Sequence, residues 1–293
     1  MLERLVGSLV TTLEPHRVEL LVVDNGSDEP ATRRYLERLP ETLDGGTFER
    51  VRVVVDDTPF NYSALNNRAA ALADGDFLCL LNDDVEAIGH ADWLEAMVRH
   101  AREDAIGCVG AKLLYPDDTV QHAGVMLGMG AVAGHPFKGL HRDDPGPADY
   151  LRRVQRVSAV TGACLVLRHS VFDDVGGFDE RLAVAWNDVD LCLRVGVAGH
   201  ANLWTPEATL YHHESVSRGT DGRPGRAARR RHAAEVRHMH EKWGDALARD
   251  PLLEHRVPTS ARRPVRRTEP SPRSSEPTLG RRLTKALART RTA

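Results

Sequence analysis

Two adjacent carboxylates follow one of the most apolar runs in the sequence. The run FLCLL, residues 77–81, leads directly into Asn82, Asp83 and Asp84. Like charges at the end of a buried strand repel each other, and a divalent cation removes that repulsion. Mg²⁺ and Mn²⁺ prefer oxygen ligands and bind one or two carboxylates together with substrate phosphates. The pair therefore indicates a metal and phosphate site, and the alternative is an Asp-rich turn that only ends the strand.

A second polar turn has the same form. Two valines lead into Asp24, Asn25 and a following Gly-Ser pair. A carboxylate in this position can accept hydrogen bonds from the base or the ribose of a nucleotide. Because Asn-Gly is also common in ordinary turns, the motif alone is weak evidence.

A third carboxylate stands at the start of a predicted helix, in WNDVD, residues 186–190. Asn187 is predicted to be the N-cap, and Asp190 to complete a capping-box-like arrangement and to pair with Arg194. These roles leave Asp188 at the mouth of the helix, where the helix dipole keeps a carboxylate ionised. Such a group suits general-base chemistry, and the alternative is an ordinary helix-favouring aspartate.

A histidine pair follows a predicted strand in YHHES, residues 211–215. Adjacent side chains of an extended chain point to opposite faces, so one of His212 and His213 can face a given site. Neutral imidazole is a common metal ligand. The alternative is a histidine pair on the surface or in the core.

Short apolar runs and helical patterns alternate around these motifs, which predicts βαβ units and a mainly parallel sheet. Strands are predicted at residues 19–23, 51–55, 77–81, 106–114, 163–167 and 208–212. Helices are predicted at residues 31–39, 63–73, 91–102, 188–197 and 226–243. Ligands bind beyond the carboxyl ends of the strands in such sheets, where Asp24 and Asp83 stand. The long Gly/Pro/His-rich stretch at 124–147 is predicted to be a functional loop or a lid.

The composition favours a globular protein with a distinct tail. Of the 293 residues, 41% are hydrophobic and 28% charged, which is enough for a core and a soluble surface in one large or two small domains. A net charge of −3 gives no reason to expect a nucleic-acid partner. Residues 256–293, however, hold 11 Lys/Arg against 2 Asp/Glu. We expect this Pro-rich tail to be disordered, with peripheral membrane contact as its possible function.

Four separated cysteines indicate buried thiols in a reducing compartment, because no pair has metal-binding or redox spacing. They are Cys79, Cys108, Cys164 and Cys192. The N-terminus lacks the long apolar region of a signal peptide, and the longest uncharged apolar stretch, residues 123–134, is shorter than the ~20 residues that span a bilayer. We therefore expect a cytoplasmic protein, with peripheral contact of its tail with the inner face of the plasma membrane as the alternative to a solvated tail.

The order of these motifs resembles the family 2 glycosyltransferases with the GT-A fold, especially the bacterial members that build cell-surface polysaccharides and include rhamnosyltransferases. The matching stretches are LLVVDNGSD, PFNYSALNNRAAALADGDFLCLLNDDVE, WLEAMVRHA, GAKLLYPDDTVQHAGVMLG, VTGACLVLR, VGGFDERLAVAWNDVDLCLRV and ATLYHHESVSRG. The resemblance implies an α/β GT-A domain at residues 1–255, with a mostly parallel central sheet flanked by helices, followed by the tail at 256–293.

The resemblance also implies a reaction, namely an inverting transfer of a sugar from a nucleotide-diphosphate donor to an acceptor hydroxyl. The implied donor is dTDP-rhamnose or a UDP-hexose, and the implied acceptor is lipid-linked or a polysaccharide. The residues that the resemblance assigns are Asp24, Asn25, Asn66 and Asp83 for the nucleotide, Asp84 and His212 for Mn²⁺ or Mg²⁺, Asp188 as the base, and Trp186, Gly177 and Asp179 on the acceptor side.

One departure from the family pattern concerns the first strand. Family members normally begin with a central strand reading like VSIVIPT, and Met1 stands just after that position, so we expect either a start assigned too late or a shortened domain. Two alternatives remain open. A nucleotidyltransferase acting on sugar phosphates would need a Gly-rich phosphate loop near the N-terminus, which is not visible. A non-catalytic, glycosyltransferase-like binding protein would lack activity.

Overall fold

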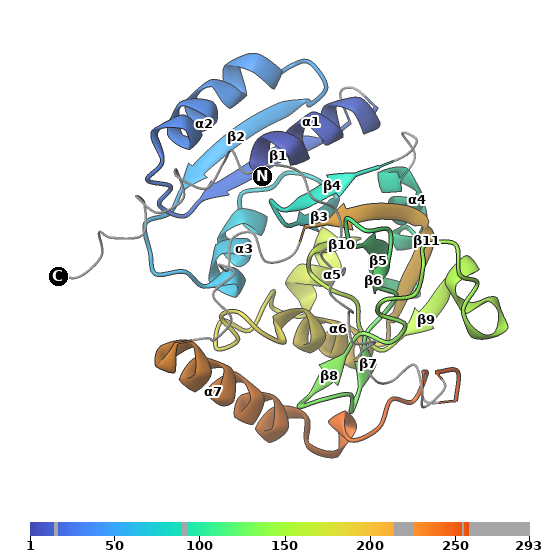
Figure 1. The fold of residues 1–293 in the computed structure, drawn as a ribbon. Helices are drawn as coiled ribbons and strands as arrows, with labels where there is room; N and C mark the ends of the chain where they lie inside the picture. The colour runs from blue at the N-terminus through green and yellow to red at the C-terminus, as the bar shows by residue number, and fades with distance from the viewer. Residues whose placement is uncertain (15–16, 89–92, 214–224, 254, 258–293) are drawn as a thin grey trace, which may run out of the picture.

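The computed structural model describes residues 1–14, 17–88, 93–213, 225–253 and 255–257. Apart from Arg256 and Val257, the predicted disordered tail lies outside the described residues. Figure 1 shows helices packed around a central sheet, with a separate pair of strands beside it.

The helices are α1 (Leu2–Thr12), α2 (Pro30–Leu43), α3 (Tyr62–Ala70), α4 (Trp93–Ala101), α5 (His169–Asp174), α6 (Asn187–Val197) and α7 (Arg226–Trp243), with short 3₁₀ turns η1 (Pro147–Arg152) and η2 (Gly244–Leu247). The strands are β1 (Glu19–Asp24), β2 (Arg50–Val55), β3 (Phe77–Leu81), β4 (Val85–Ala87), β5 (Ile106–Leu114), β6 (Val120–His122), β7 (Met126–Leu127), β8 (Ala133–Gly134), β9 (Gln155–Val157), β10 (Cys164–Arg168) and β11 (Ala201–His212).

The α/β class is confirmed, but the prediction of a mainly parallel sheet is wrong. The central sheet is mixed, with strand order β3-β10-β5-β11-β4 and with β6 and β9 paired to β5 and β11. Among the described ladders only β1–β2 and β5–β11 are parallel. β10 runs antiparallel to both neighbours and lies between β3 and β5. Local periodicity cannot reveal this insertion, because it depends on pairing between segments far apart in the chain.

Most predicted elements are present with small shifts at their ends. Strand β5 and helix α7 have the predicted bounds, whereas β11 begins at Ala201 rather than at 208. This longer strand carries a register shift between Thr205 and Thr209, which breaks its regular alternation. Such an irregularity hides the first part of a strand from a pattern-based prediction.

The segment at 124–147, predicted to be a functional loop or a lid, is anchored in the protein core at several positions, which opposes the lid alternative, whereas His135 and Lys138 of the same segment line the large cleft described below. It contains the β7–β8 hairpin, and Val132 and Phe137 are each 1% exposed. The Phe137 ring also lies against the Tyr150 ring, with centroids 4.7 Å apart. These apolar side chains anchor the segment despite its many glycines and prolines.

All four cysteines are free thiols, as the spacing predicts, but one of them is not buried. Cys108, Cys164 and Cys192 lie in the core, whereas Cys79 in the middle of β3 is exposed. Leu78 and Leu80 beside it are buried, since successive side chains of a strand point to opposite faces. No described helix is long and apolar enough to cross a bilayer.

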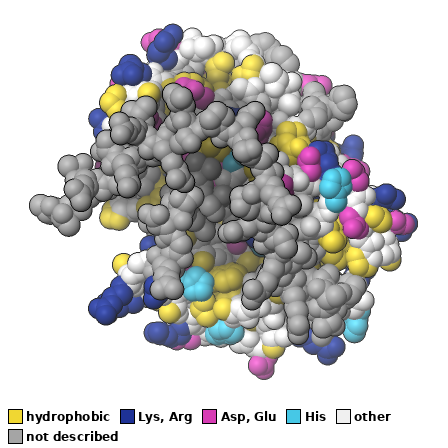
Figure 2. Space-filling view, in the orientation of Figure 1, with side chains coloured by type: hydrophobic (Ala, Val, Ile, Leu, Met, Phe, Trp, Pro, Cys, Tyr) yellow, Lys and Arg dark blue, Asp and Glu magenta, His cyan; other side chains and the backbone are white. Residues whose placement is uncertain are grey.

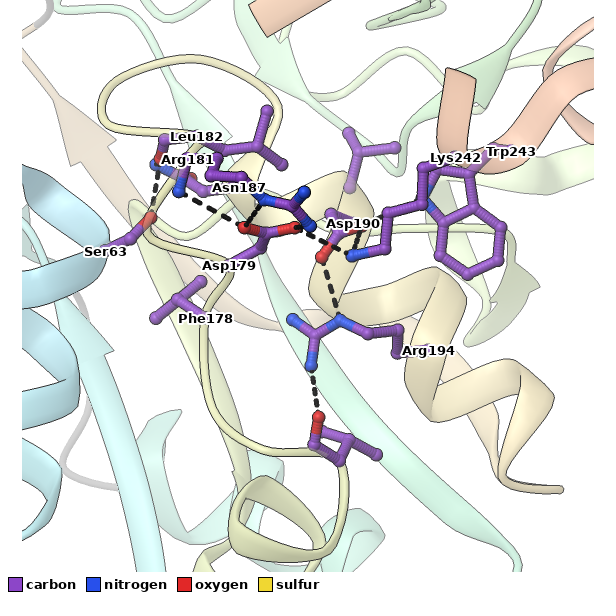
Figure 3. A network of polar contacts seen from close by, with 12 residues as sticks. Ser63, Phe178, Asp179, Arg181, Leu182, Asn187, Asp190, Arg194, Lys242 and Trp243 are labelled. Carbon is purple, nitrogen blue, oxygen red and sulfur yellow. Dashed lines mark hydrogen bonds and ion pairs between the residues drawn. The ribbon is translucent and has the colours of Figure 1, made fainter. Parts of the chain in front are cut away.

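Helix α7 is fastened to α6 by a buried ionic network (Figure 3). Asp190 of α6 is 0% exposed, and its carboxylate contacts Arg194 Nε at 2.8 Å, Lys242 Nζ at 2.7 Å and Trp243 Nε1 at 2.9 Å. Lys242 Nζ also lies 3.0 Å from Asp179 Oδ2. The Lys242 ammonium group therefore joins α7 both to α6 and to the loop that precedes α6.

The predicted Asp190–Arg194 pair is thus confirmed, but the predicted capping box is wrong. Trp186, not Asn187, is the N-cap residue of α6, with φ 66° and no side-chain cap hydrogen bond. The Asp190 carboxylate is drawn away from the helix N-terminus by Lys242 and Trp243. These partners belong to α7 and are invisible to a local capping rule.

Asp190→Asn should lower the free energy of unfolding by about 3 kcal/mol, because it leaves Arg194 and Lys242 without the buried carboxylate that they share. Asp174→Asn, at an exposed position of α5, should change it by less than about 0.5 kcal/mol. Urea unfolding followed by circular dichroism measures both. Equal stability of the two variants would contradict the structural importance of the network.

Candidate active site

The predicted donor, metal and base residues line one cleft of about 2060 Å³. Asp24, Asp83, Asp84 and Asp188 all face it, together with His212. The cleft is larger than the usual ~300–1,000 Å³ of a ligand site because it continues between β1 and β3, whose residues line it throughout. β1 and β3 belong to different sheets. The described residues do not test the expectation of a further strand ahead of α1.

The end of β1 carries two of the predicted nucleotide contacts. Asp24 Oδ1 accepts a hydrogen bond from the Ser27 amide at 2.9 Å, which fixes the turn after the strand. Asn25 Nδ2 donates to the Asp56 carbonyl oxygen at 2.6 Å and to that of Thr58 at 2.8 Å. The Asn25 amide group thus ties the ends of β1 and β2 together at the mouth of the cleft.

Asn66 of α3 also lines the cleft, as predicted for a nucleotide contact. Its Nδ2 donates to the Tyr62 carbonyl oxygen at 2.8 Å, so part of its amide group serves its own helix. Nucleotide binding by Asp24, Asn25 and Asn66 stays a prediction, and the position of each residue in the cleft is consistent with it.

The two adjacent carboxylates have different surroundings. Asp83 is exposed in the cleft, and desolvation there, with the negative charge of Asp84, raises its pKa. Asp84 is 7% exposed, and its Oδ1 lies 3.0 Å from Nε2 of His212. A cation near both carboxylates would relieve the repulsion that raises the Asp83 pKa.

The pairing of β4 with β11 decides which histidine faces the carboxylates. His212 lies opposite Val85 in this ladder, and the His213 amide donates to the Asp84 carbonyl oxygen at 2.8 Å. His213 turns the other way, with Nε2 2.8 Å from Glu86 Oε2. His212 is therefore the histidine beside Asp84.

Asp84 and His212 fit a small divalent cation. Neighbouring ligands of an octahedral ion at ~2.1 Å lie ~3 Å apart, similar to the 3.0 Å between Asp84 Oδ1 and His212 Nε2. Within the described residues, no group of three or more His, Cys, Asp and Glu side chains could hold a metal ion. Such a pair suits a cation that takes its other ligands from water and from substrate phosphates.

The predicted base lies in the same cleft, held by backbone amides. Asp188 Oδ2 accepts a hydrogen bond from the Gly162 amide at 3.0 Å, and Oδ1 accepts one from the Val189 amide at 2.8 Å. Desolvation nevertheless raises the pKa of Asp188, and these hydrogen bonds oppose part of the rise. A held carboxylate with a raised pKa is the kind of group that can accept a proton.

The space beside Gly162 is tight, so a larger residue would displace the Tyr62 side chain by a few tenths of an ångström. A Cβ there would lie 3.1 Å from the Tyr62 hydroxyl oxygen and 3.5 Å from the Asp188 Cβ. Tyr62 also donates a hydrogen bond to the Gly162 carbonyl oxygen at 3.0 Å. Sequence reasoning assigned Gly162 and Tyr62 no role, although both stand in stretches that carry the family resemblance.

The three predicted acceptor-side residues are in different environments. Trp186 lines the cleft, and its Nε1 is buried without a hydrogen-bond partner among the described residues. Gly177 and Asp179 are not among the residues that line the cleft. The Asp179 carboxylate contacts Arg181 and Lys242, and the hydrogen bonds from these groups lower its pKa despite desolvation. The acceptor-side roles of Gly177 and Asp179 stay predictions.

Several cleft residues were missed by sequence reasoning. They are His122, His135, Lys138, Arg229, Arg231 and His232. The first three come from the segments around β6 and β8, and the others come from the N-terminal half of α7. A run of basic residues at the start of a helix gave no signal for a site, because such runs usually form a solvated face.

Comparisons with known proteins identify the family of this chain. The sequence model described as "Glycosyl transferase family 2" matches residues 1–176. An O-antigen biosynthesis protein of Myxococcus xanthus is 40% identical over 76% of this chain, which spans only 17% of that protein. The N-acetylglucosaminyl-diphospho-decaprenol L-rhamnosyltransferase of Mycobacterium tuberculosis is 30% identical, with 75% of this chain and 74% of that protein covered.

The fold has a solved counterpart. The crystal structure of GalNAc-T7 with UDP, GalNAc and Mn²⁺ superposes with a TM-score of 0.62 at 16% identity, covering 83% of this chain and 45% of that one. Its identity is low, so it supports the fold alone. With the family match over residues 1–176 and the relatives above, the chain belongs to glycosyltransferase family 2.

Proposed function

We propose that this protein transfers a sugar, with inversion, from a nucleotide-diphosphate sugar to an acceptor hydroxyl during cell-surface polysaccharide synthesis, and that the reaction needs Mn²⁺ or Mg²⁺. The observation that carries the proposal is the placement in one cleft of the Asp84–His212 pair and the amide-held carboxylate of Asp188. Family membership favours this reaction over nucleotidyl transfer.

Each residue has a defined part in this mechanism. Asp84 and His212 would hold the cation, which when bound would stabilise the negative charge of the leaving nucleoside diphosphate. Asp24, Asn25 and Asp83 border the nucleotide end of the cleft. Asp188 accepts the proton of the acceptor hydroxyl as that oxygen attacks the anomeric carbon from the face opposite the leaving group. Trp186 forms the wall against which the acceptor sugar lies.

Basic residues in one part of the cleft support a phosphate-bearing acceptor. Lys138, Arg229 and Arg231 line the cleft, and Figure 2 shows Lys and Arg side chains gathered over α7 at the lower left of the view. Their positive charge would attract an anion such as the diphosphate of a lipid-linked acceptor. The name of the Mycobacterium tuberculosis relative describes an acceptor of this kind.

The donor consistent with that relative is dTDP-rhamnose, with a UDP-hexose as the alternative. A lipid-linked acceptor would place the enzyme in the cytoplasm at the inner face of the membrane. Equal transfer to a lipid-diphosphate sugar and to the corresponding free sugar would argue against the phosphate-binding role of the α7 arginines.

Asp84→Asn should abolish Mn²⁺-dependent binding of UDP and dTDP while the fold is kept, because the neutral amide is a poor ligand for a hard cation. Calorimetry with each nucleotide, with and without Mn²⁺, measures the effect. Asp174→Asn, which removes an exposed carboxylate of α5 that does not line the cleft, is the charge-matched control. Mn²⁺-dependent affinity equal to wild type in Asp84→Asn would rule out this metal site.

Asp188→Asn should reduce kcat by about 10²–10⁴-fold while Mn²⁺-dependent nucleotide binding is unchanged, because it removes the base and not a donor contact. In the wild type, the raised Asp188 pKa should place the acid limb of the kcat/KM profile above ~3.9, the usual pKa of an aspartate. Activity should rise with pH through that limb, as the carboxylate loses its proton. An active Asp188→Asn variant with the same acid limb would refute the assignment.

A further inference from the structure

Gln121 lies behind the proposed metal site and makes two hydrogen bonds to a single residue, His212. Gln121 is the middle residue of β6 and is 5% exposed. Its Nε2 donates to the His212 carbonyl oxygen at 3.2 Å, and its Oε1 lies 2.6 Å from the imidazole Nδ1. Neither the family resemblance nor the proposed mechanism gives this side chain a role.

The two contacts indicate which nitrogen of the His212 imidazole ring carries a hydrogen. A carbonyl oxygen can only accept, so the Gln121 atom beside the His212 carbonyl must be the amide nitrogen. The other atom of the amide group is then the oxygen, which also only accepts. His212 Nδ1 must therefore carry a hydrogen. In the neutral ring this arrangement leaves the lone pair on Nε2.

Nε2 is the atom 3.0 Å from Asp84 Oδ1, so a cation bound between the two groups would meet that lone pair, whereas without a cation Asp84 accepts a hydrogen bond from a protonated Nε2. A histidine that binds a metal commonly donates its other N–H group to a fixed acceptor, which sets both the tautomer and the orientation of the ring. The carboxamide oxygen of Gln121 is such an acceptor.

We propose that Gln121 is a positioning residue that holds His212 as the Nδ1–H tautomer, with Nε2 directed at the metal. The inference rests on the metal site of the proposed function. Gln121 itself contacts neither the cation nor the substrate; it acts through the imidazole ring.

The backbone around Gln121 makes it a rigid support. The Val120 amide donates to the Leu140 carbonyl oxygen at 2.7 Å, and the Gly139 amide donates to the Val120 carbonyl oxygen at 2.8 Å. On the other side, β6 pairs with β5 through Leu113 and Leu114. A side chain that starts from a strand held on both sides has little freedom to move, as a positioning residue requires.

A second buried glutamine provides a matched control. Gln155 of β9 is 9% exposed, donates to the Tyr150 carbonyl oxygen at 3.0 Å and accepts from Arg256 at 3.2 Å. It does not line the cleft. Replacement of either glutamine by methionine removes a buried amide with little change of volume, so the general cost of losing hydrogen bonds is present in both variants.

The first measurement needs no metal, and it is made in an Asp84→Ala background, because Asp84 Oδ1, 3.0 Å from Nε2, would otherwise compete with Gln121 for the ring proton. In this metal-free protein, at a pH where the ring is neutral, ¹⁵N NMR of His212 should show Nδ1–H as the main tautomer. Gln121→Met should produce a mixture with Nε2–H, because the acceptor is lost. Gln155→Met should leave the wild-type tautomer. Gln121→Glu should also keep Nδ1–H, since a carboxylate oxygen still accepts from it.

The second measurement uses Mn²⁺ alone, titrated against the full chain and followed by electron paramagnetic resonance of the free ion. Gln121→Met should weaken Mn²⁺ binding by about 10–100-fold, as expected when an outer-shell partner of a ligand is removed. Gln155→Met should bind Mn²⁺ as the wild type does, even if its melting temperature falls.

The outcomes separate this proposal from the proposed function. A wild-type tautomer and wild-type Mn²⁺ affinity in Gln121→Met would overturn the inference, provided that Asp84→Asn and His212→Ala weaken Mn²⁺ binding. If those two variants also bind Mn²⁺ normally, the metal site itself is wrong. If Gln121→Met does not fold, Gln121→Glu decides, because loss of the Nδ1–H tautomer in that variant contradicts the proposed acceptor role.

Discussion

The contact between Asp84 and His212 is the interaction on which the proposed chemistry depends, and one short ladder creates it. Antiparallel pairing of β4 with β11 places His212 opposite Val85, directly after the Asp84 carboxylate. The resulting 3.0 Å contact joins a group from the first third of the chain to one from the end of the last strand. Gln121 then fixes the imidazole from behind. A cation site made this way is incomplete without a substrate, which suits an ion that binds together with a diphosphate.

The proposed base, Asp188, is held by backbone amides, and an ionic network around Asp190 holds the helix that carries it. Gly162 and Val189 donate to the Asp188 carboxylate, while Asp190, two residues later, is tied to α7 by Lys242. The two aspartates of one helical turn therefore have separate tasks. Asp188 faces the cleft, and Asp190 joins α6 to α7. Because the N-terminal half of α7 also lines the cleft, the same helix borders the cleft and holds the helix that carries Asp188.

The mixed sheet explains why the site is compact although its residues are distant in sequence. β10 enters antiparallel between β3 and β5, so the turn that precedes it, with Gly162, lies beside the end of β3. The Asn82 amide donates to the Ala163 carbonyl oxygen at 3.0 Å, which joins the metal side and the base side through the backbone. A mainly parallel sheet, which the strand–helix alternation predicts, would not by itself bring these two turns together in this way.

The sequence alone was sufficient for the α/β class, the family and most of the helix and strand positions, because these follow from local periodicity and from motifs that stand close together in the chain. It also placed Asp24, Asp83, Asp84 and Asp188 at strand and helix ends, where they line one cleft. Tertiary structure alone decided that His212 rather than His213 faces Asp84, that Asp190 binds α7 instead of capping its own helix, and that Gln121 supports the metal side. Each of these outcomes depends on a partner far away in sequence, and a local pattern carries no information about which distant segment will pack against it.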